Sequence, residues 1–162
     1  MISSLSILPA VPADLPHILR FIRGLAEYEK LAHACVANEE RLTQTLFGPH
    51  PYAHVLIARL NNQPVGFALY FYNYSTFLAQ PGLYLEDLFV LPEFRKQGVG
   101  RSLFTRLAQI ARDQHCGRFE WSVLDWNQPA IDFYKRIGAT ILDDWRICRL
   151  TADQITQLAE SK

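Results

Sequence analysis

The stretch "YLEDLFVLPEFRKQGVGRSLF" (Tyr84–Phe104) decides the fold, because it holds two structural periods and the turn between them. Its first part belongs to a short apolar run over Leu83–Val90, which is typical of a strand. From Arg101 onward the apolar residues recur at helical spacing. The apolar face of the expected helix comprises Leu103, Phe104, Leu107, Ala108, Ile110 and Ala111. The stretch predicts a strand, a tight turn and a helix in succession.

The segments on both sides extend this unit into a mixed sheet. His54–Leu60 and Val65–Tyr74 have strand patterns, and the turns "NNQP" and "AQPG" join them to Leu83–Val90 in an antiparallel meander. After the helix, Arg118–Leu124 has the pattern of another strand. A strand, a helix and a strand in this order form a right-handed crossover with parallel strands.

The two ends of the chain add further elements. "LSILPAVPAD" contains a short first strand, and Asp14 is expected to cap the helix that follows it. Asn38 and Gly48 are the expected limits of a second helix. The remaining expected elements are a helix capped by Asn127 or Asp125 and stopped by Gly138, a last strand over Trp145–Leu150, and a terminal helix from Thr151.

The composition limits the class of protein. The 162 residues are 49% hydrophobic, which suits one α/β domain over residues 1–162 with a mixed, mostly antiparallel sheet flanked by helices. Sixteen Lys and Arg balance sixteen Asp and Glu, so no global field attracts nucleic acid or an anionic membrane. No apolar run approaches the ~20 residues that span a bilayer.

Cysteine and histidine spacing gives no metal signal. The three cysteines are far apart and favour a reducing cytoplasm over a disulfide framework or a zinc site. His50 and His54 are four residues apart, but Pro49 and Pro51 oppose a helix there. We therefore expect loop histidines and no bound metal.

Gly98 and Gly100 raise the question of an anion site. Glycines at a helix start leave backbone N–H groups open to an anion, and the helix dipole adds positive potential. Arg95, Lys96 and Arg101 add charge. The pattern is not a P-loop, which needs Lys-Ser or Lys-Thr after its last glycine, nor a dinucleotide fingerprint, which needs a third glycine. On these residues alone, a phosphate cradle and a plain strand-to-helix turn both remain open.

The wider context resembles a known superfamily. Tyr84–Phe104 and "DWNQPAIDFYKRIGA" (Asp125–Ala139) together resemble the GNAT superfamily of acetyl-CoA-dependent N-acetyltransferases, whose [RQ]xxGx[GA] cofactor loop matches Arg95–Gly100. Within it, the blocks "YLED", "WN" and "FYKRIGA" resemble the spermidine/spermine and thialysine N-acetyltransferases. "LAEYEKL" and "LFGPHPYAHVLIA" in the first half do so too, and the resemblance covers nearly the whole chain.

The resemblance implies that acetyl-CoA is the co-substrate and that its diphosphate lies on the glycine turn. A core strand position is the plainer reading of Val90, and it is compatible with a cofactor role. The implied cofactor residues are Arg95, Lys96, Gln97, Gly98, Val99, Gly100 and Arg101 at the turn, then Leu88, Phe89 and Val90 for the pantetheine arm, and Asn127, Pro129 and Ala130 further along.

Acetyl transfer to an amine needs a base, a donor to the oxyanion and a proton donor to the thiolate. The resemblance makes Glu86 the proton acceptor, directly or through water; a solvated or structurally bonded carboxylate is the alternative. It makes Tyr134 the proton donor, with a buried structural tyrosine as the alternative. A backbone N–H near Leu88 is the candidate oxyanion donor, which a β-bulge would free. Regular alternation would place Asp87 on the side of Leu85 and Phe89.

The resemblance divides over the acceptor amine. Polyamine-acetylating relatives carry an Asp and a Trp, two apart, where this chain has Ser75 and Phe77. One anionic contact for a polycation is thereby lost, and the chain looks more like the thialysine branch. We expect a small primary amine or an ammonium-bearing amino acid. The implied substrate residues are Tyr28, Glu29, Phe77, Glu86 and Asp87, with Asp143 or Asp144 as further acids and a solvated helix end as the alternative for Tyr28 and Glu29.

Three functions remain open from the sequence. The first is a catalytic amine N-acetyltransferase, and the presence of both Glu86 and Tyr134 favours it. The second is a non-catalytic acyl-CoA-binding protein of the same fold. The third is an interaction domain whose long aromatic strand forms a partner surface. That strand could equally serve the homodimer that the resemblance implies.

Overall fold

A computed structural model describes residues 4–161 of the chain. These residues form two compact units, of which the first ends at Ser122 and the second begins at Val123. The expectation of one domain over residues 1–162 stays a prediction.

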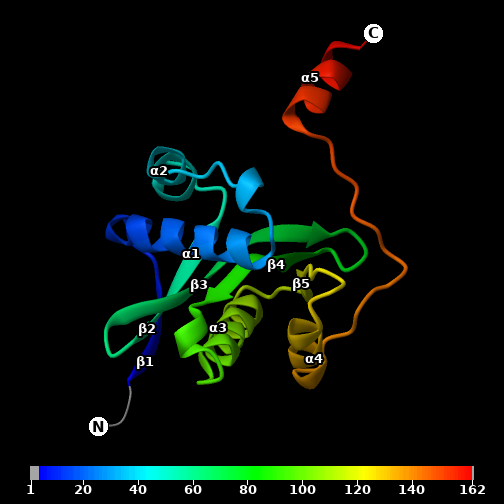
Figure 1. Cartoon of the computed structure of the whole chain (residues 1–162). Helices are drawn as coiled ribbons and strands as arrows, with labels where there is room; N and C mark the ends of the chain where they lie inside the picture. The colour runs from blue at the N-terminus through cyan, green and yellow to red at the C-terminus, as the bar shows by residue number, and fades with distance from the viewer. Residues whose placement is uncertain (1–3, 162) are drawn as a thin grey trace. The chain divides into compact units, whose positions relative to one another are not determined.

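The first unit is built on a five-stranded mixed sheet (Figure 1). The strands are β1 (Leu5–Pro9), β2 (His54–Leu60), β3 (Gln63–Ser75), β4 (Gln80–Val90) and β5 (Arg118–Trp121), in that spatial order. The first four pair antiparallel, and β5 pairs parallel to β4. The predicted meander, crossover and mixed α/β sheet are confirmed. The β3–β4 hairpin is longer than predicted, because Gln80–Gly82 continue the strand.

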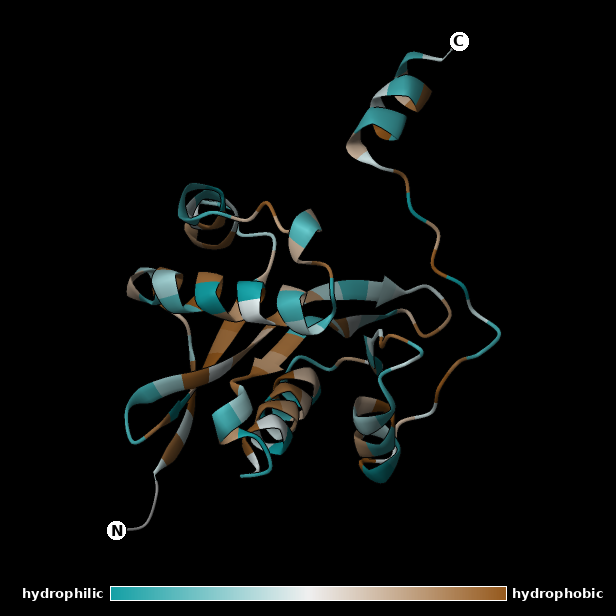
Figure 2. Cartoon of the chain, viewed as in Figure 1, coloured by the Kyte–Doolittle hydropathy of each residue, from teal (hydrophilic) through white to brown (hydrophobic). Residues whose placement is uncertain are grey.

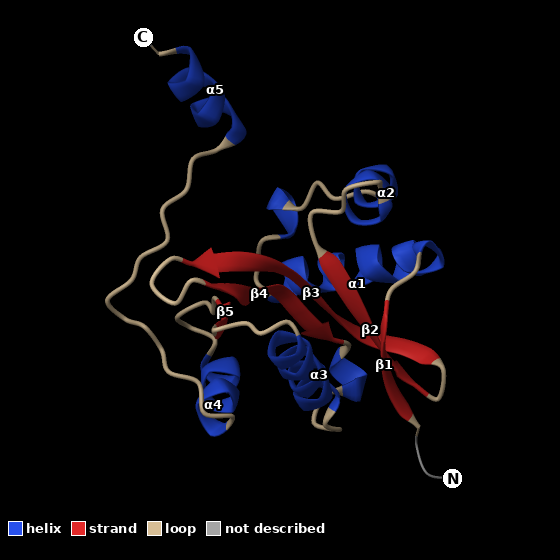
Figure 3. Ribbon diagram, turned by 180° about the vertical axis from the view of Figure 1, so that it is seen from behind, coloured by secondary structure: helices blue, strands red, loops and turns tan. Residues whose placement is uncertain are grey.

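Helices lie on both faces of this sheet. Figures 1 and 3 show α1 and α2 on one face and α3 on the other. The helices are α1 (Leu15–Tyr28), α2 (Glu39–Phe47) and α3 (Val99–Asp113), with 3-10 turns at Pro12–Asp14, Ala32–Ala34 and Pro92–Phe94. The predicted apolar face of α3 is confirmed for Leu103, Phe104, Leu107 and Ala111, whereas Ala108 is exposed.

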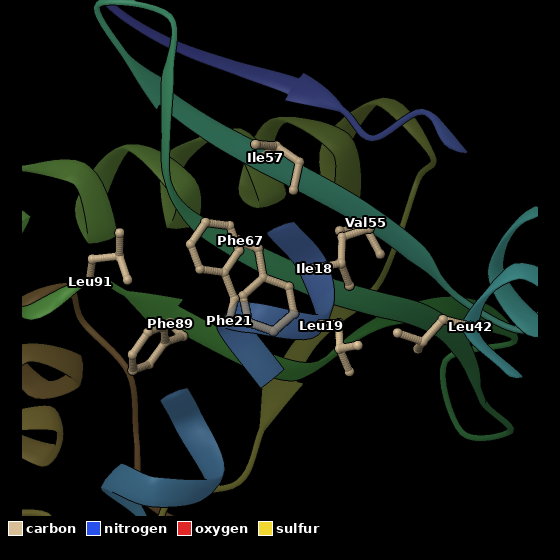
Figure 4. Close-up of a cluster of buried hydrophobic side chains, with 9 residues drawn as sticks. All are labelled: Ile18, Leu19, Phe21, Leu42, Val55, Ile57, Phe67, Phe89 and Leu91. Carbon is tan, nitrogen blue, oxygen red and sulfur yellow. The ribbon is translucent and has the colours of Figure 1, made fainter. Parts of the chain in front are cut away.

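The core between α1 and the sheet is aromatic and aliphatic (Figure 4). The ring of Phe21 on α1 lies 5.7 Å from that of Phe67 on β3 and 6.5 Å from that of Phe89 on β4. Hydrophobic residues are concentrated in the middle strands of the sheet (Figure 2). Burying such rings stabilises the fold and fixes α1 above the end of β4.

The expected limits of α2 are confirmed, whereas the predicted cap of α1 is wrong. Asn38, at the expected start of α2, also caps that helix, since its side-chain oxygen accepts a hydrogen bond from the Arg41 N–H at 2.9 Å. Asp14 precedes α1 as expected, but its carboxylate does not cap that helix. It accepts from the Val11 N–H at 3.0 Å and pairs with Arg59 of β2 instead. Asp14 is buried, and a buried carboxylate is stabilised most by a cation.

The second unit holds two helices, α4 (Gln128–Arg136) and α5 (Ala152–Glu160). Asn127 caps α4 by accepting from the Ala130 N–H at 3.4 Å, and Gly138 follows with a φ of +92°, both as predicted. The predicted strand over Trp145–Leu150 is wrong. A strand needs a partner ladder, and the described residues of this unit contain no other strand. The expected strand at Arg118–Leu124 also ends early, at Trp121.

Between residues 4 and 161, none of the helices combines the length and the apolar character required to cross a membrane. In the same range, no group of three or more His, Cys, Asp and Glu side chains could hold a metal ion.

Candidate active site

The glycine turn presents backbone N–H groups at the start of α3. Gly98 is the N-cap residue with a φ of +82°, and Lys96 also has a positive φ, of +60°. The Ser102 N–H donates to the Gly98 carbonyl at 2.9 Å as the first bond of the helix. The N–H groups of Val99, Gly100 and Arg101 therefore have no acceptor within the helix. They lie at the positive end of its dipole, which favours an anion.

The space in front of these glycines is open. A Cβ added at Gly98 or Gly100 would meet no heavy atom within 4 Å, whereas one added at Gly66 would lie 2.7 Å from the Phe89 carbonyl oxygen. Internal packing therefore does not explain the two glycines of the turn. Their amides and open faces fit a diphosphate such as that of acetyl-CoA.

The outer edge of β4 is open beyond Leu85. The parallel pairing with β5 covers only Gly82–Leu85. The Leu91 N–H donates to the Val65 carbonyl of β3 at 2.9 Å. Because antiparallel bonding alternates along a strand, the backbone groups of Leu88 and Val90 point away from β3. No described strand pairs with them there, so an extended ligand could add along this edge.

Glu86 forms a β-bulge in β4. Asp87 is opposite Leu69 and Leu85 is opposite Tyr70, so Glu86 has no partner on β3. Cross-strand partners share a face, and consecutive residues lie on opposite faces. Asp87 therefore lies on the face of Phe89, as predicted, but not on that of Leu85. The expectation for Leu85 is wrong because the bulge interrupts the alternation.

Three acids gather at this bulge. Burial, together with the negative charges of Glu86 and Glu29, raises the pKa of Asp87 to about 6. Burial also raises the pKa of Glu29, the residue after α1. The structure thus brings together three of the acids that the sequence assigned to the substrate. Such a cluster favours a bound ammonium group, because a cation offsets the repulsion between the carboxylates.

A cleft of about 740 Å³ lies between α1 and the end of β4, and none of the three acids lines it. Tyr28 and Arg95 are in its wall. So are Arg20 and Arg23, which sequence reasoning missed. Their spacing of three on the polar face of a helix is the signal that could have found them. The cleft is lined by Pro16, Leu19, Arg20, Arg23, Gly24, Glu27, Tyr28 and Glu39 from the helices, and by Phe89, Leu91, Pro92, Glu93 and Arg95 from β4 and the turn after it.

The other predicted site residues lie elsewhere. Phe77 is fully exposed at the tip of the β3–β4 hairpin. Asp87 is seven positions from the start of β4, about 23 Å along the strand, so the hairpin tip is not beside the acids of its own chain. In the second unit, Asn127, Pro129 and Ala130 form the start of α4, and Tyr134 is a half-buried residue of the same helix.

Comparisons with known proteins identify the family of this chain. The model of the Acetyltransferase (GNAT) family matches residues 22–139. Thialysine N-epsilon-acetyltransferase of Sus scrofa is 39% identical, over 97% of this chain and 98% of that protein. L-ornithine N5-acetyltransferase NATA1 of Arabidopsis thaliana is 33% identical, over 90% of this chain and 84% of that protein.

A solved structure is similar over the whole length. It is an integron cassette protein from the mobile metagenome of V. cholerae, with a TM-score of 0.82 and 26% identity, covering 98% of this chain and 99% of that one. The family match exceeds half of the chain, and it includes the glycine turn, the acid cluster and all of α4. This chain belongs to the Acetyltransferase (GNAT) family.

Proposed function

We propose that this protein is an acetyl-CoA-dependent N-acetyltransferase that acetylates a primary amine of a small molecule by direct attack. The amine belongs to a thialysine-like amino acid or to a diamine or polyamine. One observation carries the proposal: a single strand, β4, joins an acid cluster at Glu86 and Asp87 to an open edge at Leu88–Val90 and then to the glycine turn. In this order the three parts would serve as the acceptor site, the channel for the arm that carries the thioester, and the cradle for the diphosphate.

The glycine turn and the open edge hold the cofactor. The amides of Lys96–Arg101 would bind the diphosphate, and the backbone of Leu88–Val90 would bind the pantetheine arm. Acetyl-CoA, when bound, supplies the thioester that carries the acetyl group. Of the outward groups on this edge, the Val90 carbonyl already accepts from Arg95 Nε at 2.9 Å. Asn127, Pro129 and Ala130 are proposed to flank the cofactor by resemblance.

The acid cluster prepares the amine. An alkyl ammonium group with a pKa of about 10.4 must lose its proton before it attacks. Glu86, exposed on the bulge, would accept that proton directly or through water. Asp87 and Glu29 would hold the ammonium form in place before the transfer. Tyr28 and Phe77 complete the residues that the resemblance gives to the acceptor, although Phe77 lies beyond the start of β4, about 23 Å along the strand from Asp87.

Two further groups act on the reacting centre. The outward N–H of Leu88, next to the bulge, would donate to the oxyanion of the tetrahedral intermediate. Tyr134 would donate a proton to the departing thiolate. These roles come from the family resemblance together with the local geometry of each residue.

The acceptor class follows from the relatives and from one departure. The two relatives described above are named for thialysine and L-ornithine, which are amino acids with a side-chain amine, while a less similar relative is named as spermidine/spermine N(1)-acetyltransferase-like. Ser75 lacks the carboxylate of the polyamine-acetylating pattern, and its side chain is buried. This favours an amino acid over spermidine. The resemblance further implies a homodimer, while the cysteine usage and the balance of charges favour a cytoplasmic enzyme that acts without nucleic acid, membrane or metal.

Release of free thiol from acetyl-CoA tests the proposal. The panel comprises thialysine, ornithine, lysine, putrescine and spermidine, with mass spectrometry of the products. Thiol release that depends on one of these amines is the expected result. Coenzyme A that binds without any turnover on the panel would favour a non-catalytic acyl-CoA-binding protein. Absence of binding in calorimetry would exclude both.

A further inference from the structure

Arg95 begins the cofactor loop, yet its side chain turns back onto two other elements. Its Nε donates to the Val90 carbonyl of β4 at 2.9 Å. Its guanidinium carbon lies 5.0 Å from the centre of the Tyr28 ring, on the last residue of α1, and 5.4 Å from that of the Phe89 ring. One side chain thus connects the loop, the strand and the end of the helix.

The ring on the strand side is held firmly. Phe89 is only 5% exposed. A Cβ added at Gly24 of α1 would come within 2.8 Å of its ring, so the helix backbone lies directly against it. The other side of Phe89 faces Phe21 of the core, with 6.5 Å between the ring centres. The guanidinium of Arg95 therefore contacts a Phe89 ring that is fixed by packing, and the Tyr28 ring is its second aromatic contact.

The chemistry of this arrangement requires arginine. A planar guanidinium can lie near aromatic faces while an N–H in its plane donates to a carbonyl. A lysine ammonium group can satisfy only one of these contacts from a single position. The loop beyond Arg95 needs such an anchor, because Lys96 and Gly98 both have positive φ. An anchored loop loses less conformational freedom when an anion binds.

We propose that Tyr28 is a positioning residue for the cofactor. Together with Phe89 it holds Arg95, and Arg95 holds the glycine turn in the shape that receives the diphosphate. The inference rests on the proposed function, since the anion is taken to be that of coenzyme A. It gives the Tyr28 ring a role that differs from the acceptor contact implied by the resemblance. It also connects the helix end that carries Glu29 to the cofactor loop.

Calorimetric titration with coenzyme A alone tests the inference, because it needs no acceptor and no turnover. Tyr28→Leu removes the ring and should weaken coenzyme A binding about threefold to tenfold. Tyr28→Phe keeps the ring and should stay within about twofold of the wild type. Tyr52→Leu is the matched control, since Tyr52 is 81% exposed and outside the cleft. In turnover, Tyr28→Leu should raise the KM for acetyl-CoA more than it lowers kcat.

A double-mutant cycle separates this mechanism from a loss of folding. Arg95→Lys keeps the charge and should weaken coenzyme A binding by a factor similar to that of Tyr28→Leu. Both substitutions disrupt the same contact between Arg95 and Tyr28. The double variant should therefore bind coenzyme A about as well as the single variant with the lower affinity. Circular dichroism checks that each variant is folded. If Tyr28→Leu does not fold, the Arg95→Lys result still tests whether Arg95 anchors the loop.

The opposing outcomes are distinct. If the wild-type protein does not bind coenzyme A, the proposed function itself is wrong. Wild-type protein that binds it, while Tyr28→Leu binds equally well and only the acceptor KM rises, defeats the inference alone. Additive losses in the double variant also overturn it, since Tyr28 and Arg95 would then act independently.

Discussion

Tyr134 is the single residue whose replacement tests the proposed chemistry most directly. Tyr134→Phe keeps the ring, whose centre lies 5.7 Å from that of Phe133, and removes only the hydroxyl. Loss of a general acid lowers turnover by about 100-fold, whereas binding of coenzyme A needs no proton from this group. We expect kcat to fall and the calorimetric Kd for coenzyme A to stay within about twofold. An equal loss of turnover and affinity would instead indicate a structural tyrosine.

Asp87 should make both stability and acceptor binding depend on pH. Its pKa of about 6 lies above the ordinary 3.8, so between these values the folded state holds more protons than the unfolded state. The free energy of unfolding therefore falls as the pH rises through this window. Above about pH 6 the whole destabilisation from the ionised, buried Asp87 is present. Asp87→Asn removes the ionisation and should raise the free energy of unfolding at pH 8 by about 2 kcal/mol. Urea titrations at pH 4, 6 and 8 measure the difference.

The same substitution should weaken the binding of the amine. Ionised Asp87 attracts an ammonium group, so the acceptor KM of the wild type should rise as the pH falls below about 6. Asp87→Asn should show a raised acceptor KM at every pH and an unchanged Kd for coenzyme A. A variant that gains no stability and keeps the wild-type acceptor KM would show that the carboxylate is solvated and has no role.

At the scale of the element, the start of α3 separates folding from binding. Gly100 lies inside the helix with open space around it, and alanine there is favoured over glycine by up to about 1 kcal/mol. Gly100→Ala should therefore raise the melting temperature slightly while its methyl group obstructs the diphosphate. Gly98→Ala should lower the melting temperature, because its φ of +82° disfavours a Cβ. Thermal melts and coenzyme A titrations of both variants provide the comparison. Undiminished affinity in Gly100→Ala would place the anion elsewhere.

The sequence predicted most elements because local signals mark them. Helix α3 follows from its apolar spacing, Asn38 lies at the start of α2 as expected, and Asn127, one of the two expected caps of α4, caps that helix. The position of the bulge could not be predicted, since nothing in "LEDLF" distinguishes Glu86 from Asp87 as the extra residue. Asp14 was assigned to the wrong partner because its contact with Arg59 joins residues far apart in the sequence. Neither feature is encoded within a few residues.

The same limit applies to long-range features of the site. The alternating pattern of Trp145–Leu150 predicts a strand, yet a strand exists only where a partner ladder is available. The gathering of Glu29 with Glu86 and Asp87 depends on how α1 crosses the sheet, which local spacing does not state. Resemblance supplied the identity of these acids, and the fold supplied their proximity.

At the scale of the whole molecule, the balance of sixteen basic and sixteen acidic residues has a consequence for the cofactor. A chain without net charge exerts little long-range attraction on an anion such as coenzyme A. The electrostatic part of binding must then come from cations near the glycine turn, chiefly Lys96 and Arg101. Salt should weaken binding through these two side chains rather than through the field of the whole chain.

The double variant Lys96→Gln, Arg101→Gln therefore tests the origin of this attraction. Loss of two charge-assisted contacts should weaken coenzyme A binding by about tenfold or more at low salt, and the dependence of Kd on salt between about 50 and 300 mM should flatten. Arg112→Gln is the matched control, because it removes a charge from the last turn of the same helix, where Arg112 pairs with Asp113 at 2.8 Å. A local origin predicts that this control keeps the wild-type affinity and salt slope. Equal weakening in both variants would show that the summed charge of the molecule, and not the turn, attracts the anion.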